Sequence, residues 1–156
     1  MPSLESHVFD IARTIQLAVA PVFLLTAIGT IINALAGRLA RAVDRRRLLE
    51  DLVPTQEGER RDDMLQELHI LARRIYLVLW AMAASVFSAL LVCLLIGTAF
   101  VGAFISLDLS RPVAALFVAA VAALTVGLVL FMREVFLAAL SVRHITHPQP
   151  ERVDRT

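Results

Sequence analysis

Three long stretches of this 156-residue chain contain no Asp, Glu, Lys, Arg or His: residues 14–37, 77–107 and 112–132. A helix crosses the hydrocarbon core of a bilayer in about 20 residues, so each stretch is long enough to cross it. The absence of titratable groups excludes a proton relay or a hard-cation site inside the membrane. The sequence therefore predicts an all-α integral membrane protein with three transmembrane helices.

Lysine is absent and cysteine occurs once, while 58% of the residues are hydrophobic and the mean hydropathy is +0.75. This composition lies outside the range of soluble domains, whose surfaces must stay polar. A single cysteine cannot form a disulfide within the chain. Because Cys93 lies in the middle of the second apolar stretch, we interpret it as a small apolar residue.

Motifs of nucleophilic, metal and nucleotide chemistry are also missing: there is no P-loop, no Gly-rich dinucleotide turn, no HExxH and no Cys pair. His144 and His147 are three residues apart, but Pro148 follows at once and no third ligand is near. We therefore expect no enzymatic activity, no catalytic residue, no cofactor and no metal.

The arginines indicate the orientation of the chain in the membrane. Thirteen of the fifteen basic residues lie at residues 38–74 or 133–155, and only Arg13 and Arg111 lie on the other side of the spans. Basic residues close to a span end are retained in the cytoplasm. We therefore expect the N-terminus outside and the C-terminus in the cytoplasm.

The remaining segments also have helical patterns. Apolar residues at helical spacing near the N-terminus predict an interfacial amphipathic helix on the outer leaflet. Pro54 and Gly58 interrupt a second helical pattern, which predicts a cytoplasmic helical hairpin. The predicted division is 3–13 interfacial helix, 14–37 first span, 38–75 hairpin, 76–105 second span, 112–132 third span continuing to about 143, and 144–156 flexible cytoplasmic tail.

The hairpin carries nearly equal numbers of arginines and acidic residues. This balance is typical of salt-bridged, solvated helix faces and argues against nucleic-acid binding. Docking of a cytoplasmic protein partner is the alternative. The arginines nearest the lipid bilayer can also bind anionic lipid head groups, at about 1 kcal/mol each.

Small residues recur at every fourth position in the last two spans. The second span has Ala81, Ser85, Ala89, Cys93 and Gly97, and the third has Ala115, Ala119, Ala123 and Gly127. Small residues let helix backbones approach closely, which drives association in a bilayer. These two small-residue ridges predict tight packing between the second and third spans, with contact between subunits as the alternative.

The first span has a polar stripe, formed by Thr26, Thr30, Asn33 and Gly37. Such a stripe either packs against neighbouring helices or, in a ring of subunits, lines a narrow aqueous path. Ser and Thr can also donate to carbonyls of their own helix, which favours packing.

Three pieces of the chain, APVFLLTAIG (20–29), NALAGRLARAVDR (33–45) and LFMREVFLA (130–138), resemble an uncharacterised bacterial family of three-span membrane proteins, a domain of unknown function. The resemblance covers most of the chain. It implies a bacterial inner-membrane location, and it implies no activity, substrate or catalytic residue.

Charged residues gather where the first and third spans leave the membrane on its inner side: Arg38, Arg41, Asp44, Arg133 and Glu134. We expect pairs such as Arg133 with Asp44, or Arg41 with Glu134, to join the helices there, because partial desolvation strengthens charge-assisted pairs. The alternative is that these side chains extend separately to water and lipid phosphate.

Three functions fit these patterns. The predicted one is a non-enzymatic homo-oligomer with a structural or interaction role, whose cytoplasmic hairpin binds another protein. The first alternative is a small oligomeric ion channel with the first span lining the pore; three helices cannot enclose a pore alone, so this requires a ring of subunits. The second alternative is an accessory subunit of a larger membrane complex.

Overall fold

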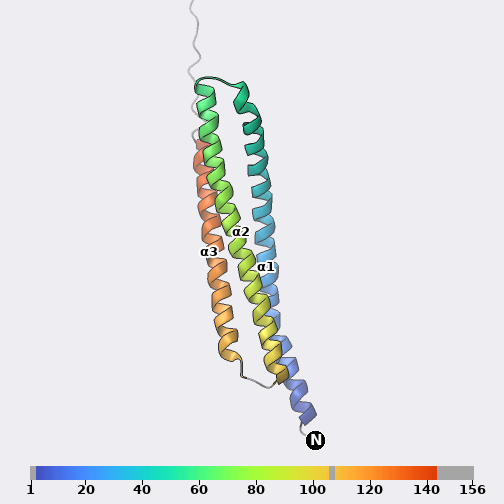
Figure 1. Ribbon diagram of the computed structural model, residues 1–156. Coiled ribbons are helices and arrows are strands. Elements are labelled where there is room, and N and C mark those ends of the chain that lie inside the picture. Colours follow the sequence, from blue (N-terminus) through green and yellow to red (C-terminus); the bar gives the residue numbers. More distant parts are fainter. Residues whose placement is uncertain (1–2, 106–107, 144–156) are drawn as a thin grey trace, which may run out of the picture.

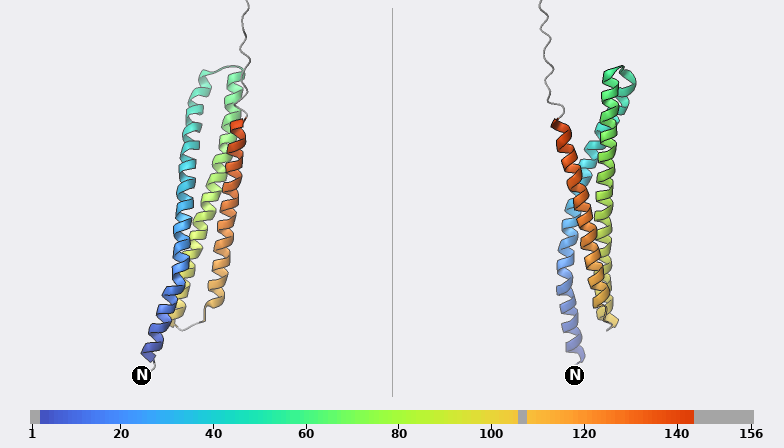
Figure 2. Two further views of the ribbon diagram at one scale, coloured as in Figure 1. Left: turned by 180° about the vertical axis from the view of Figure 1, so that it is seen from behind. Right: turned by 90° about the vertical axis from the view of Figure 1, so that its left-hand side faces the viewer.

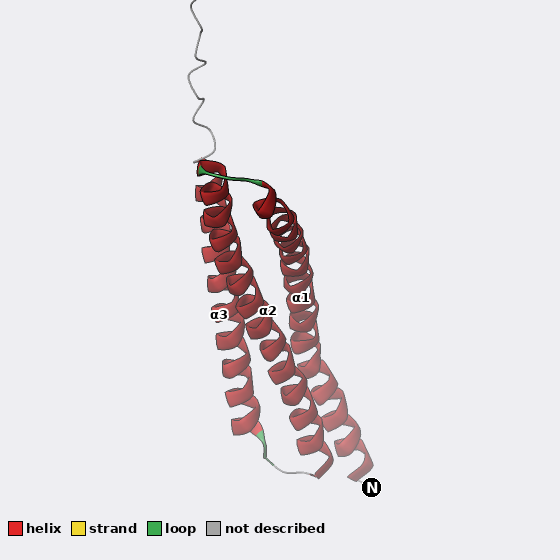
Figure 3. Ribbon diagram, turned by 45° about the horizontal axis from the view of Figure 1, so that its top comes forward, coloured by secondary structure: helices red, strands yellow, loops and turns green. Residues whose placement is uncertain are grey.

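Three long helices run side by side in the computed structural model, which describes residues 3–105 and 108–143. They are α1 (Ser3–Leu52), α2 (Glu59–Ile105) and α3 (Ser110–Arg143), and a short 3-10 helix, η1 (Val53–Thr55), lies after α1 (Figure 1). Figure 3 shows that little of the described chain lies outside helices. Each of the three long helices contains a segment long and apolar enough to cross a membrane.

Helix α2 is central, because it packs against both α1 and α3 and runs antiparallel to each of them (Figures 1 and 2). The described part of α3 ends short of the turn that joins α1 to α2, so among the described residues only α1, η1 and α2 reach this tip (Figure 1).

The buried residues lie seven apart in α1 and α3, and after one seven-residue step they alternate three and four apart in α2, so all three rows follow a seven-residue repeat. They are Pro21, Ile28, Leu35, Ala42 and Leu49 in α1; Leu71, Val78, Ala81, Ser85, Ser88, Val92 and Leu95 in α2; and Ala120, Gly127 and Glu134 in α3. A seven-residue repeat keeps one face of a helix against its neighbour when the helices supercoil with a left hand. We call these rows the buried seams.

Two clusters of buried side chains lie along these seams. The first cluster consists of Ile28, Val92 and Ala120, one residue from each long helix. Closer to the tip, Leu35 packs with Val78 and Ala81. Since the seams continue to Leu49 and Leu71, the same packing extends past the apolar stretches.

The turn between α1 and α2 follows from two residues. The sequence predicts an interruption at Pro54 and Gly58, and α1 ends at Leu52 while α2 begins at Glu59. Gly58 has φ 66°, a left-handed conformation that glycine adopts without strain. Its carbonyl accepts the first N–H groups of α2, from Arg61 at 3.0 Å and from the next residue at 3.3 Å.

Parts of the predictions fall outside the described structure. The side chains of residues 3–13 are not described, so their amphipathic face stays a prediction; their backbone belongs to α1 without a break before the first span. The predicted tail, 144–156, and residues 106–107 of the link before α3 also lie outside the described residues.

Candidate functional site

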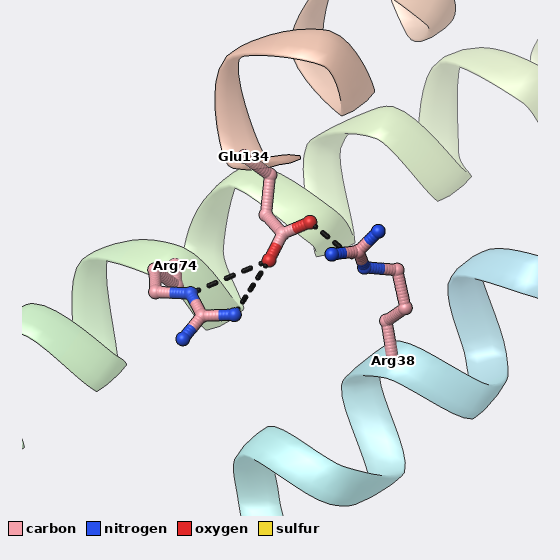
Figure 4. A network of polar contacts seen from close by, with 3 residues as sticks. All are labelled: Arg38, Arg74 and Glu134. Atoms are coloured by element: carbon pink, nitrogen blue, oxygen red, sulfur yellow. Dashed lines mark hydrogen bonds and ion pairs between the residues drawn. The ribbon is translucent and has the colours of Figure 1, made fainter. Parts of the chain in front are cut away.

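Glu134 is a carboxylate in the buried seam of α3, only 1% exposed. Its Oε1 accepts hydrogen bonds from Arg74 Nε at 3.3 Å and Arg74 Nη2 at 2.9 Å. Its Oε2 lies 3.1 Å from Arg38 Nε. Figure 4 shows the carboxylate between the two guanidinium groups. We call Arg38, Arg74 and Glu134, one residue from each long helix, the ionic triad.

The two contacts of Glu134 differ in kind. Arg74 makes aligned hydrogen bonds, whereas Oε2 faces Arg38 as an ion pair without hydrogen-bond alignment and has no other partner among the described residues. The Arg38 guanidinium also lies 5.4 Å from the centre of the Phe131 ring, a cation–π arrangement. Two arginines and one glutamate leave the ionic triad with one net positive charge.

The buried seams bring the triad together. Arg38 follows Leu35 by three residues, Arg74 follows Leu71 by three, and Glu134 follows Gly127 by seven. These are seam positions, so the side chains point towards the neighbouring helices. The arginine side chains stay 29% and 22% exposed, because long stems let the charged heads reach the surface.

The triad lies at one end of the apolar stretches. Arg38 directly follows residues 14–37, and Glu134 comes two residues after the end of 112–132. On α2, Tyr76 and Trp80 are exposed near this level, with ring centroids 6.0 Å apart in an edge-to-face arrangement. Such aromatic residues are typical of the boundary between lipid and water.

Only part of the predicted charge cluster comes together. Arg38 and Glu134 meet, whereas Arg41, Asp44 and Arg133 are exposed and take part in no ion pair among the described residues. The expected pairs Arg133 with Asp44 and Arg41 with Glu134 do not form, because Arg41, Asp44 and Arg133 lie off the buried seams. Sequence reasoning missed Arg74, although it shares the spacing of Leu71, Val78 and Ala81.

The small-residue ridges pack at one end only. Ala81, Ser85 and Gly127 are buried together, and a Cβ added at Gly127 would lie 3.0 Å from Ser85 Oγ. Ala89 and Ala123 are half-buried, while Cys93, Gly97, Ala115 and Ala119 are exposed. Four residues turn a helix by about 400°, so each step moves the ridge about 40° away from a neighbouring helix.

Farther from the triad, α2 and α3 meet through residues that the ridges do not include. Ser88 Oγ donates to the Ala120 carbonyl at 2.7 Å, and both residues are fully buried. The close approach of the two backbones therefore passes through Ala120, whereas its neighbour Ala119 faces away.

The polar stripe of α1 faces away from α2 and α3. Thr26 and Thr30 are exposed and donate to carbonyls of their own helix, at 3.4 and 3.1 Å. Asn33 is exposed. Gly37 is half-buried, and a Cβ added there would lie 3.8 Å from Arg41 Nη1. No described side chain of α2 or α3 hydrogen-bonds to the stripe.

Beyond the triad, α1 and α2 are joined by a second ion pair. Arg45 donates to both carboxylate oxygens of Glu67, at 2.9 and 3.1 Å, and the two side chains are 50% and 39% exposed. The hydrogen bonds to Glu67 raise the pKa of Arg45 above its ordinary value. At the opposite end, Ser110 donates through its backbone N–H and its hydroxyl to Asp108, which lowers the pKa of that carboxyl.

Within the described residues, no group of three or more His, Cys, Asp or Glu side chains could hold a metal ion. The arrangement at the triad can fix three helices and can present guanidinium groups to an anion at the surface.

Residues 18–144 match the family described as "Protein of unknown function (DUF2721)". The chain belongs to this family. The DUF2721 match contains the whole ionic triad and the turn at Gly58, and it excludes the predicted interfacial helix and all but the first residue of the predicted tail. No curated protein and no solved structure matches the chain.

Proposed function

We propose that this DUF2721 protein is a non-enzymatic, homo-oligomeric protein of the bacterial inner membrane, with its N-terminus outside and its C-terminus in the cytoplasm. Residues 38–75, the extension of α1 and α2 past the ionic triad, serve as a cytoplasmic hairpin that docks a protein partner. For residues 3–13 to rest on the outer leaflet as an interfacial helix, α1 must bend where the first span begins, since the two segments form one continuous helix in the structure.

The observation that carries the proposal is the apolar surface of this extension. Leu48, Leu65 and Ile70 are 52%, 45% and 41% exposed, although they lie beyond the apolar stretches. A contiguous apolar patch outside a membrane is typical of a surface that binds another protein, and we take these side chains as parts of one such patch. The surrounding charges are nearly balanced, which favours a protein over a nucleic acid as the partner.

The arginines support the proposed orientation. Arg73 and Arg133 are exposed beside the triad, at the end of the molecule that also carries the extension. Basic residues at a span end favour the cytoplasmic side. They would also attract anionic lipid head groups there.

Two measurements test the proposal. Native mass spectrometry of the protein released from lipid nanodiscs counts its copies; two or more support assembly, and a monomer contradicts it. A photo-crosslinking amino acid, encoded by an amber codon in place of Leu65, tests docking directly. We expect a discrete protein adduct that disappears when Leu48 and Ile70 are replaced by Gln; no adduct in the unsubstituted background contradicts docking.

A channel is the second candidate, because the polar stripe lies on an exposed face of α1 where a ring of copies would surround it. Ion flux through liposomes containing the protein, lost in Asn33→Leu while assembly persists, would support this function. Equal flux in both proteins, or none in either, would contradict it.

A further inference from the structure

Helix α1 has a second row of residues opposite its buried seam. The polar stripe advances by four, three and four residues, and the same alternation continues through Ala40, Asp44, Arg47 and Asp51. All of these residues are exposed except Gly37, which is half-buried. Because this row also averages 3.5 residues per turn, it stays in line along the whole helix. We call the row from Thr26 to Asp51 the outward seam.

The outward seam is a poor surface for lipid. Between Phe23 and Leu48, α1 exposes no large apolar side chain. The other two helices differ, since α2 exposes Trp80, Phe87 and Leu90 and α3 exposes Phe117, Val118 and Val129. Small and polar residues are enriched where membrane helices contact each other, because they permit close approach and hydrogen bonding between helices.

Asn33 provides a reason for such a contact. It precedes Arg38 by five residues, so it lies about 7 Å inside the apolar stretch. Its amide is exposed and has no hydrogen-bond partner among the described residues, whereas Thr26 and Thr30 donate to their own helix. An amide carries both donors and an acceptor, so it can pair with the same amide of another copy.

The charges beyond the membrane indicate which partner fits. Arg41 lies beside the outward seam, and Asp44, Arg47 and Asp51 lie on it, so the face is neutral and its charges alternate in sign. None of these four takes part in an ion pair among the described residues. In a parallel two-fold pair each of these residues lies opposite its own counterpart, so the long Arg47 side chain must extend about 4.5–6 Å along the helix axis to pair with the two aspartates of the other copy.

We propose that the outward seam is the interface for a second copy of this chain, with two α1 helices packed in parallel around a two-fold axis along the membrane normal. Copies inserted with the same orientation can meet in this way through identical surfaces. The dimer would pair the Asn33 amides within the membrane. The inference rests on the proposed homo-oligomer and specifies its interface.

Two exposed glycines provide a matched test. A Cβ added at Gly29, which flanks the outward seam, or at Gly97 of α2 meets nothing within 4 Å, so neither leucine substitution starts with a clash inside the single chain. We expect Gly29→Leu to weaken dimerisation at least about tenfold in a bilayer titration by energy transfer between labelled copies. We expect Gly97→Leu to leave it unchanged. The opposite pattern, or equal effects, would overturn the inference.

Cysteine crosslinking tests the same interface without adding bulk. In a Cys93→Ala background, single cysteines replace Thr30 or Asn33 on the outward seam and, as a control, Leu90 on the exposed face of α2. We expect oxidation in membranes to give a disulfide-linked dimer from the two seam positions and little from the control.

The outcomes separate the inference from the proposed function. Crosslinking at the seam together with two copies by native mass spectrometry supports both. An oligomer that crosslinks only at the control position overturns this interface and leaves the homo-oligomer standing, whereas a monomer overturns both. Seam crosslinks in a ring of four or more copies overturn the two-fold dimer in favour of a channel, and seam crosslinks to another protein overturn the second copy as the occupant.

Discussion

Glu134 and Glu67 both bind arginine across helices, but in different surroundings. The side chain of Glu134 is 2% exposed and is shared by Arg38 and Arg74, whereas that of Glu67 is 39% exposed and has one partner, Arg45. Their shortest contacts are equal, at 2.9 Å. Contact distance alone therefore does not determine how much each ion pair contributes to the stability of the protein.

Burial determines what happens when a partner is lost. A carboxylate near the surface is rehydrated when its arginine is removed, so an exposed pair contributes at most about 1 kcal/mol. A buried carboxylate cannot be rehydrated, and its loss of partners costs about 3–5 kcal/mol. The ionic triad therefore strongly favours one arrangement of the three helices, while the Arg45 pair adds little.

The largest expected effect is that of removing both triad arginines. Replacing Arg38 and Arg74 by Leu leaves Glu134 buried without a counter-charge. We expect the free energy of unfolding, measured by SDS titration in mixed micelles, to fall by about 3–5 kcal/mol. Adding Glu134→Leu to this variant should recover most of the loss, because an apolar triad carries no unpaired charge. If the triple variant is no more stable than the double variant, the unpaired buried charge is not the cause of the loss of stability.

Ser88→Ala separates burial from charge. Ser88 donates to the Ala120 carbonyl in a fully buried but neutral contact. We expect a loss of about 1 kcal/mol by the same titration, between the effects at the two glutamates. A loss as large as that of the triad variant would show that burial without charge is sufficient.

Glu67→Gln should reduce the free energy of unfolding by less than about 1 kcal/mol. Since both partners are partly exposed, we expect the difference from the unsubstituted protein to vanish in molar salt, where the Debye length is about 3 Å. The effect of the triad variant should persist under those conditions. Equal salt sensitivity at the two sites would contradict the comparison.

Replacing Asp108 should have the smallest effect on stability, because its carboxylate is exposed. Its pKa is lower in the folded chain than its ordinary value, so ionised Asp108 stabilises the folded state above that ordinary value. The contribution is lost as the pH falls through the lowered pKa. We therefore expect a small difference in thermal unfolding between the unsubstituted protein and Asp108→Asn at neutral pH, and none in acid. A difference that grows on acidification would contradict this sign.

Sequence reasoning was most successful where a single physical cause dominates. Runs without charge predict three helices able to cross a membrane, because the hydrocarbon core admits little else, and the pieces around residues 20–45 and 130–138 indicate the family. The turn could be located because Pro54 disfavours continuation of a helix and Gly58 adopts a left-handed conformation.

Side-chain partners were harder to predict, because several spacings fit one sequence. In α2, a ridge with a spacing of four and a seam with an average spacing of 3.5 both pass through Ala81 and Ser85. Beyond these residues the two rows diverge, and Gly97 belongs to the ridge alone. Choosing the ridge directed attention to Ala119, whereas the buried residue is Ala120. Choosing the seam would have placed Arg74 beside Glu134, since it occupies the position between Leu71 and Val78.

The continuity of α1 has a mechanical consequence. The helix runs without a described break from Ser3 to Leu52, and it is tied to both neighbours where Arg38 meets Glu134 and Leu35 packs. The arm from that tie to Leu52 spans 14 residues, about 21 Å. A rigid rod tilting there by about 10° would move its end at Leu52 by about 4 Å. Because α1 packs along α2 as far as Leu49 and pairs with it through Arg45 and Glu67, the two helices would move together, and a change of their tilt would displace the whole tip.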